Sequence, residues 1–166
     1  MRLSLVMPRF LLMLVMAFVA GCSGSLVHSD DRDAVEALEE GGLFEIQLHA
    51  DGKARVAVLK DASSMTDDMM AHFSGLDALD NLVLRGAPIT DAGIAHIANL
   101  SKLERLILAS TGITDAGLAQ LEGLELDTLD VTDTKVTEDA AEEFKEKTKC
   151  EVLYGEAFKE KDEEEE

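Results

Sequence analysis

Four carboxylates and two imidazoles recur at regular intervals in this 166-residue chain, and both side-chain types bind metal ions. Each set would lie on neighbouring helices, which pack about 8–10 Å apart. Calcium needs oxygens at about 2.3–2.6 Å and zinc needs nitrogens at about 2.0–2.1 Å, so neighbours at that spacing do not easily share an ion. We interpret the carboxylates as partners of positive helix ends, with a metal site as the alternative. The sets are Asp67, Asp91, Asp115 and Glu138, and His72 and His96.

No arrangement of residues indicates catalysis. The hydroxyls Ser63, Ser64, Ser110 and Thr111 have no nearby histidine in the sequence to act as a base. The chain has no HExxH or CxxC motif, and the Gly-Gly pair at 41–42 lacks the rest of a phosphate-binding fingerprint. We therefore expect a protein that is not an enzyme, with no catalytic residue, cofactor, metal or small-molecule substrate.

The elements that carry these side chains come from an internal repeat. The pentapeptide "ITDAG" begins at 89 and again at 113, "MTDDM" begins at 65 and "VTEDA" at 136, in steps of 24, 24 and 23 positions. Leucines recur in the same steps, and this periodicity predicts stacked structural units. The leucine positions are Leu79, Leu82 and Leu84, then Leu103, Leu106 and Leu108, then Leu126, Leu129 and Val131.

Each unit is predicted to be one strand followed by one helix. The last two apolar residues of "LxxLxL" are two apart and share one face of a strand. Thr90 is expected to be a helix N-cap, with Asp91 in the first turn. Ile89 and Ile94 occupy the two positions of a hydrophobic staple. A single unit cannot bury its apolar face, whereas stacked units can.

The pattern "LxxLxLxxTxITDxGLxxLxxL" resembles the leucine-rich repeat, in the variety that has a helix on its convex side. The resemblance covers about residues 55–154, with two close units and two degenerate ones. It implies an α/β fold, a short leucine-rich-repeat solenoid of about four strand–helix repeats. The variety often carries a cysteine where this chain has Ala87, Thr111 and Thr134.

Residues 30–64 are predicted to form an N-terminal cap. The segment 30–42 has the spacing of a short amphipathic helix with Val35 and Leu38 inward and a glycine stop. Residues 44–59 alternate apolar and polar residues around a turn at Asp51-Gly52, which predicts a hairpin that covers the edge of the first repeat. The repeats then occupy 65–154.

The N-terminus resembles that of bacterial lipoproteins. Arg2 and Arg9 precede an apolar run at 10–20 that is too short to span a bilayer, which takes about 20 apolar residues. The run leads into "VAGCS" at 19–23, which resembles a lipobox. The resemblance implies a signal peptide at 1–21, lipid attachment at Cys22, a tether at 22–29 and a place on the exported side of a membrane in the cell envelope. An ordinary secretory signal cleaved near Gly21 is the alternative.

The charge limits the choice of partners. The formal net charge is −19, which repels nucleic acid and anionic lipid surfaces. Residues 155–166 are predicted to be an acidic, disordered tail, because charge runs such as the one at 159–166 are usually solvated and disordered. Weak attraction of cations is the alternative role of this tail. Cys150 has no intramolecular partner if Cys22 carries lipid, and its place in "KCEVLY" predicts a small, buried residue of a strand.

The predicted concave sheet is the candidate binding face. Residues that alternate with the buried leucines give a central row of Leu59, Val83, Ile107, Asp130 and Leu153, flanked by Asn81, Arg85, Arg105, Ala109, Thr128 and Thr132. Three consecutive apolar residues would face solvent with two arginines beside them. This patch is either a docking site or reflects only the preference of Val and Ile for strand positions. The arginines are alternatively ion-pair partners of Asp61 or Asp130.

These observations together predict a non-enzymatic, membrane-anchored leucine-rich-repeat protein. The expected mechanism is protein–protein interaction, in which a protein or peptide docks on the concave sheet around Val83 and Ile107. A structural envelope lipoprotein with an acidic, cation-attracting surface is the alternative function.

Overall fold

The computed structural model describes residues 29–39 and 42–155. The predicted signal peptide, Cys22 and most of the tail lie outside these residues. None of the described helices is long and apolar enough to span a membrane.

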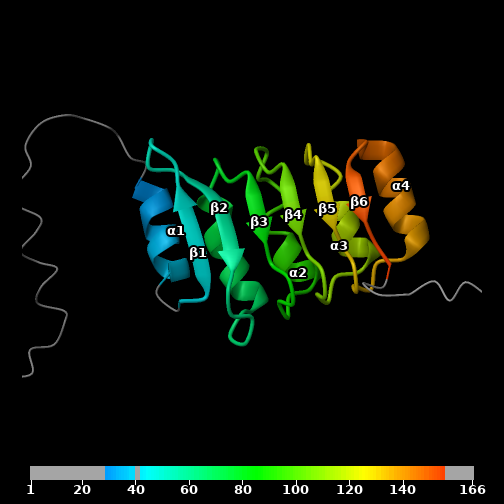
Figure 1. The fold of residues 1–166 in the computed structure, drawn as a ribbon, viewed down its shortest axis with the longest axis horizontal. Coiled ribbons are helices and arrows are strands. Elements are labelled where there is room, and N and C mark those ends of the chain that lie inside the picture. The colour runs from blue at the N-terminus through cyan, green and yellow to red at the C-terminus, as the bar shows by residue number, and fades with distance from the viewer. Residues whose placement is uncertain (1–28, 40–41, 156–166) are drawn as a thin grey trace, which may run out of the picture.

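The described residues form one six-stranded sheet with helices. Its strands lie in chain order, β1-β2-β3-β4-β5-β6, and Figure 1 shows them side by side. β1 and β2 are antiparallel, and every later pair is parallel, which confirms the expected α/β class. The strands are β1 (Phe44–Leu48), β2 (Ala54–Leu59), β3 (Asn81–Val83), β4 (Arg105–Ile107), β5 (Thr128–Asp130) and β6 (Glu151–Leu153).

Along the chain, one helical segment precedes β1, and one lies between each pair of consecutive strands from β2 to β6. Each helical segment contacts the next one in chain order. α1 lies beside β1 at one end of the sheet, and α4 lies beside β6 at the other (Figure 1). The helical segments are α1 (Ser29–Glu39), the 3₁₀ helix η3 (Asp67–Gly75), α2 (Asp91–Ile94), α3 (Asp115–Gln120) and α4 (Glu138–Thr148).

The expected N-caps are present in three units. The hydroxyls of Thr90 and Thr114 accept hydrogen bonds from the backbone N–H groups of Ala92 and Ala116, and Thr137 caps α4 in the same way. Each helix therefore begins where the sequence places it, because the threonine oxygen satisfies an N–H group that the helix leaves unpaired. The helices are shorter than the apolar stripe implies, since α2 ends at Ile94 and the chain continues in turns.

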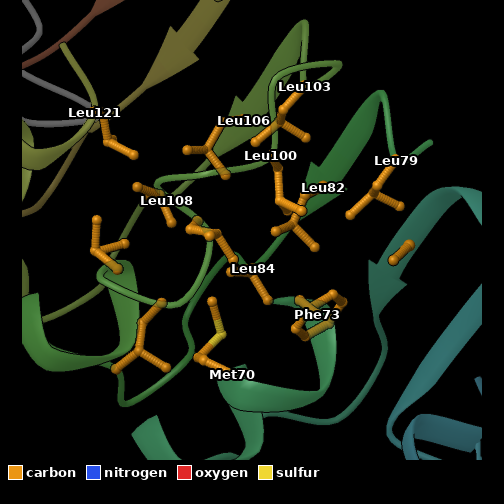
Figure 2. Close-up of a cluster of buried hydrophobic side chains, with 14 of the residues drawn as sticks. Met70, Phe73, Leu79, Leu82, Leu84, Leu100, Leu103, Leu106, Leu108 and Leu121 are labelled. Atoms are coloured by element: carbon orange, nitrogen blue, oxygen red, sulfur yellow. The ribbon is translucent and has the colours of Figure 1, made fainter. Parts of the chain in front are cut away.

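The core fills the space between the sheet and the helices. Leu82, Leu106 and Leu129 lie in register on neighbouring strands and are fully buried. Figure 2 shows Met70 and Phe73 of η3 beside the leucines of the β3 and β4 segments. Every described member of the leucine periodicity is buried, so a strand of only three residues is held by packing as well as by its backbone hydrogen bonds.

The pairing of β2 with β3 differs by one residue from the alignment of the repeats in the sequence. Val58 of β2 pairs with Val83, so Val58 and not Leu59 begins the central row. Leu59 lies one residue further along and packs against the hydrophobic core. The assignment of Leu59 to the binding face was wrong because a shift of one residue turns a side chain to the other face of a strand.

Candidate functional site

The candidate site is the face of the sheet opposite the core, here called the open face. Its central row runs across neighbouring strands in register as Val58, Val83, Ile107, Asp130 and Leu153. A second row, at the start of the strands, consists of Val56, Asn81, Arg105, Thr128 and Glu151. The alternation of side chains along each short strand places both rows on this face.

Ile107 is not an exposed apolar residue. The residue is only 7% exposed, and Ala109 beside it is 3% exposed. The guanidinium of Arg85 on the β3 segment reaches across β4 to the carboxylate of Asp130 on β5, with an Nη2–Oδ2 distance of 3.2 Å. Because this ion pair crosses the strand that carries Ile107, the expected stretch of three solvent-facing apolar residues is interrupted. A charged substitution at Ile107 would disturb folding as well as binding, so it does not test this face.

Asp130 is the anchor of this crossing. Its carboxylate is almost fully buried, and Oδ1 accepts hydrogen bonds from the backbone N–H and the hydroxyl of Thr132, at 3.0 and 2.5 Å. A buried charge is stable only when it is paired and hydrogen-bonded, and Asp130 meets both conditions. Its role is therefore to hold Arg85 over the sheet. The alternative that Arg85 pairs with Asp130 is confirmed.

Asp61, the other carboxylate considered for the arginines, has a local partner. Its Oδ1 accepts a hydrogen bond from the backbone N–H of Ser63 at 2.9 Å. This hydrogen bond lowers the pKa of Asp61 below its usual value, because it favours the charged carboxylate. Asp61 thus stabilises the turn after β2 and does not neutralise the arginines of the sheet.

The charges of the open face divide into paired and unpaired groups. Lys60 pairs with Glu45 of β1 at 2.9 Å, and Arg85 pairs with Asp130. Arg105 and Glu151 are exposed and make no ion pair or side-chain hydrogen bond within the described residues. These two unpaired charges have opposite signs and lie two strands apart in the same row.

Asn81, next to Arg105 in that row, carries an unsatisfied acceptor. Its Oδ1 is buried and has no hydrogen-bond partner. A buried acceptor without a partner costs about 1–3 kcal/mol. We expect Asn81→Val to raise the free energy of unfolding by about 1–2 kcal/mol, because valine removes this cost and favours a strand. Urea unfolding measures the change, and Thr128→Val at the equivalent position of β5 is the control, with an expected change within about 0.5 kcal/mol. A loss of stability in Asn81→Val would contradict this explanation.

The carboxylate ladder of the repeats has partners that the sequence did not reveal. Asp91 accepts hydrogen bonds from the backbone N–H and the hydroxyl of Thr114 in the next unit, at 2.8 and 2.7 Å. Asp67 binds Thr90 in the same manner, and Asp115 binds Thr137. Each carboxylate lies in the first turn of its own helix, as expected, but its oxygens bind the N-cap of the following unit. The ladder is a structural joint between units.

The imidazoles and carboxylates form no metal cluster in the described part of the chain. Within residues 29–39 and 42–155, no three His, Cys, Asp or Glu side chains gather closely enough to hold a metal ion. Three of the four repeated carboxylates, Asp67, Asp91 and Asp115, accept hydrogen bonds from threonines of the next unit. His72 lies on η3, and His96 lies just beyond α2.

Cys150 is a buried thiol, as predicted, but it lies just before β6 and not within a strand. It is 2% exposed, and burial raises its pKa to about 11. At pH 8 only on the order of one thiol in a thousand is ionised. We expect iodoacetamide at pH 8 to leave Cys150 unmodified in the native protein and to alkylate it in urea, as measured by mass spectrometry of the peptide that contains it. Equal rates in both conditions would contradict the burial.

Comparisons with known proteins find similarity at the level of structure. No protein-family profile matches the chain. No curated protein matches it either. Among solved structures, the chain is similar to the leucine-rich-repeat (LRR) ectodomain of the receptor kinase SOBIR1 from Arabidopsis thaliana, with a TM-score of 0.39 and 17% sequence identity. The similarity covers 78% of this chain and 94% of that ectodomain.

Proposed function

We propose that the protein is a lipid-anchored leucine-rich-repeat domain of about four units that binds another protein through the open face of its sheet. The observation that supports this proposal is the combination of apolar and charged side chains on a face that no other described element pairs with. Val56, Val58 and Val83 are partly exposed there and lie on adjacent strands. Adjacent apolar side chains bordered by polar ones are typical of protein-binding surfaces.

The charge distribution favours a protein over a nucleic acid as the partner. The positive and negative groups of the open face balance each other, whereas the chain as a whole carries a net charge of −19. A polyanion would be repelled by the acidic chain and would find, among the described residues of the open face, only Arg105 as an unpaired cation. A partner with its own mixture of apolar and charged groups fits this face.

Anchoring is the second part of the proposal. Cys22, at the end of the lipobox-like segment, is the proposed lipid attachment residue. Two or more acyl chains on one residue would hold the domain stably at a membrane, since one chain is marginal at about 0.8 kcal/mol per buried CH₂. Cys22→Ser is expected to release the protein from the membrane fraction and to prevent incorporation of radiolabelled palmitate. Retained label would disprove lipid attachment at this residue.

The docking proposal is tested by a matched pair of substitutions within one repeat. Val83→Glu places a charge on the open face, and Ala95→Glu places the same charge on an exposed position just after α2. Each full-length variant is immobilised and used to capture proteins from a detergent extract of the source membranes. We expect a protein that wild type and Ala95→Glu retain and Val83→Glu loses. If Val83→Glu retains the same proteins as wild type, the open face is not the binding surface.

A structural envelope lipoprotein is the second candidate, and the observation that favours it is the acidity of the chain outside the open face. In this case the acidic body and tail hold diffuse cations or space the membrane from its surroundings. Deletion of residues 159–166 separates the two functions. The docking function predicts unchanged capture, whereas the structural function predicts an envelope defect in cells that carry the deletion.

A further inference from the structure

Among the described residues, six charged side chains lie on the open face, and four of them neutralise each other in pairs. Lys60 with Glu45 and Arg85 with Asp130 form ion pairs at 2.9 and 3.2 Å. The remaining two charges, Arg105 and Glu151, lie in the same row with β5 between them. Strands are spaced about 4.8 Å apart, so their Cα atoms are about 9.6 Å apart.

The length of the arginine side chain does not explain why Arg105 and Glu151 are unpaired. Arg85 crosses one intervening strand to bind Asp130, which is the same number of strands that separates Arg105 from Glu151. Nevertheless no carboxylate lies within ion-pair distance of Arg105 in the described residues. The two groups therefore remain available as one positive and one negative contact point on a surface that is otherwise internally neutralised.

The surroundings of these two charges suit a peptide chain. Thr128 lies between them on β5 and offers a hydroxyl, and Asn81 lies on the other side of Arg105. Val83, in the next row, is available for an apolar side chain of the partner.

From these contacts we infer that the open face binds a protein segment that carries one carboxylate and one basic side chain, which pair with Arg105 and Glu151 respectively. This inference rests on the proposed docking function and specifies the chemistry of the partner. A segment with several acidic residues is disfavoured, because the exposed carboxylates of Glu104 and Asp127 lie at the border of the same row. A phosphate-bearing partner is also disfavoured, because a phosphate group offers no cation to Glu151.

The inferred charge pattern of the partner segment is tested with two pentapeptides. The ¹⁵N-labelled full-length protein in a mild non-ionic detergent is titrated with acetyl-Val-Asp-Val-Lys-Val-amide. The comparison peptide, acetyl-Val-Asn-Val-Gln-Val-amide, lacks both charges. We expect the charged peptide to shift the backbone signals of Arg105, Thr128 and Glu151. It should also bind about tenfold more tightly than the neutral peptide, because each of the two hydrogen-bonded ion pairs strengthens binding about threefold.

Variants of the protein separate specific pairing from the general attraction of charges. The double variant Arg105→Gln, Glu151→Gln should reduce the affinity for the charged peptide about tenfold, to that of the neutral peptide. The control is Lys102→Gln, Glu125→Gln, which removes one positive and one negative exposed charge from the connections beside the sheet. The control should bind as wild type does.

Two results would overturn the inference. One is equal affinity of the two peptides. The other is an equal loss of affinity in the control and in the double variant. Either result leaves the docking face itself standing if Val83→Glu still loses the captured protein. If Val83→Glu retains that protein, the docking function fails independently of the peptide titration.

Discussion

Asp91→Ala is expected to lower the free energy of unfolding by about 3–5 kcal/mol, the largest effect of any substitution considered for this protein. Asp91 accepts two hydrogen bonds from Thr114, one from the backbone N–H and one from the hydroxyl. Hydrogen bonds to a charged acceptor contribute about 1.5–3 kcal/mol each, and their loss leaves an N–H group without a partner at a joint between two units. Since domains of this size are stable by about 5–15 kcal/mol, the change removes a large part of the total.

Glu138→Ala is the matched control for this prediction. Glu138 occupies the same position in the last unit, where its side chain makes no hydrogen bond within the described residues. Its loss should cost only about 0.3–1 kcal/mol, the contribution of a first-turn carboxylate to helix stability. Guanidinium unfolding followed by circular dichroism measures both variants. Equal costs for Asp91 and Glu138 would show that the ladder acts through the helix dipole and not through the threonine hydrogen bonds.

Gly117→Ala is expected to destabilise the protein by about 2–3 kcal/mol, although alanine is the better helix former by about 1 kcal/mol. A Cβ atom at Gly117 would overlap Oδ1 of Asp91 in the preceding unit. That oxygen accepts the hydrogen bond from the Thr114 backbone, so the carboxylate cannot move away without losing it. The substitution therefore costs either overlap or a hydrogen bond.

Gly75→Ala serves as its control, since a Cβ atom at Gly75 meets no atom within 4 Å. We expect it to be neutral or to stabilise by up to about 1 kcal/mol. Thermal unfolding of both variants at one pH gives the comparison. A stabilised Gly117→Ala would mean that Asp91 has a second arrangement in which it keeps its bonds to Thr114.

The sequence predicted the class of fold and the buried residues, because these depend on periodicity. The spacing of the leucines places Leu82, Leu106 and Leu129 on one strand face, and all three are buried. It also placed Thr90 at the start of a helix. Such features require only local residue types and a repeat length.

The composition of the open face was harder to predict because it depends on register and on long side chains. A shift of one residue misplaced Leu59, since β2 precedes the close repeats and has no leucine triplet to fix its alignment. The burial of Ile107 depends on where the Arg85 guanidinium lies, and the sequence offered Asp61 and Asp130 as equal partners. Only the three-dimensional arrangement separates them.

The repeated pentapeptide also held information that local reasoning did not extract. The threonine of "ITDAG" caps its own helix, as the sequence indicates, and it also binds the aspartate of the preceding unit. The aspartate and glycine instead have roles between units, because Gly93 and Gly117 leave room for the carboxylates of Asp67 and Asp91. A residue whose partner lies one repeat away shows no signal in its own segment. Its recurrence at a fixed period was the one available sign.

The Asp–Thr ladder has a consequence for how such a chain can change in length. Each internal unit presents an aspartate to the unit after it and a threonine to the unit before it, so it is compatible with its own copies on both sides. Duplication of the 24 residues from 89 to 112 would therefore add a unit with both joints matched. A unit of 23 residues is also accommodated, because the last step is one residue shorter and Asp115 still binds Thr137. Whole-unit duplication is thus the route by which a protein of this architecture can lengthen its sheet without first losing stability.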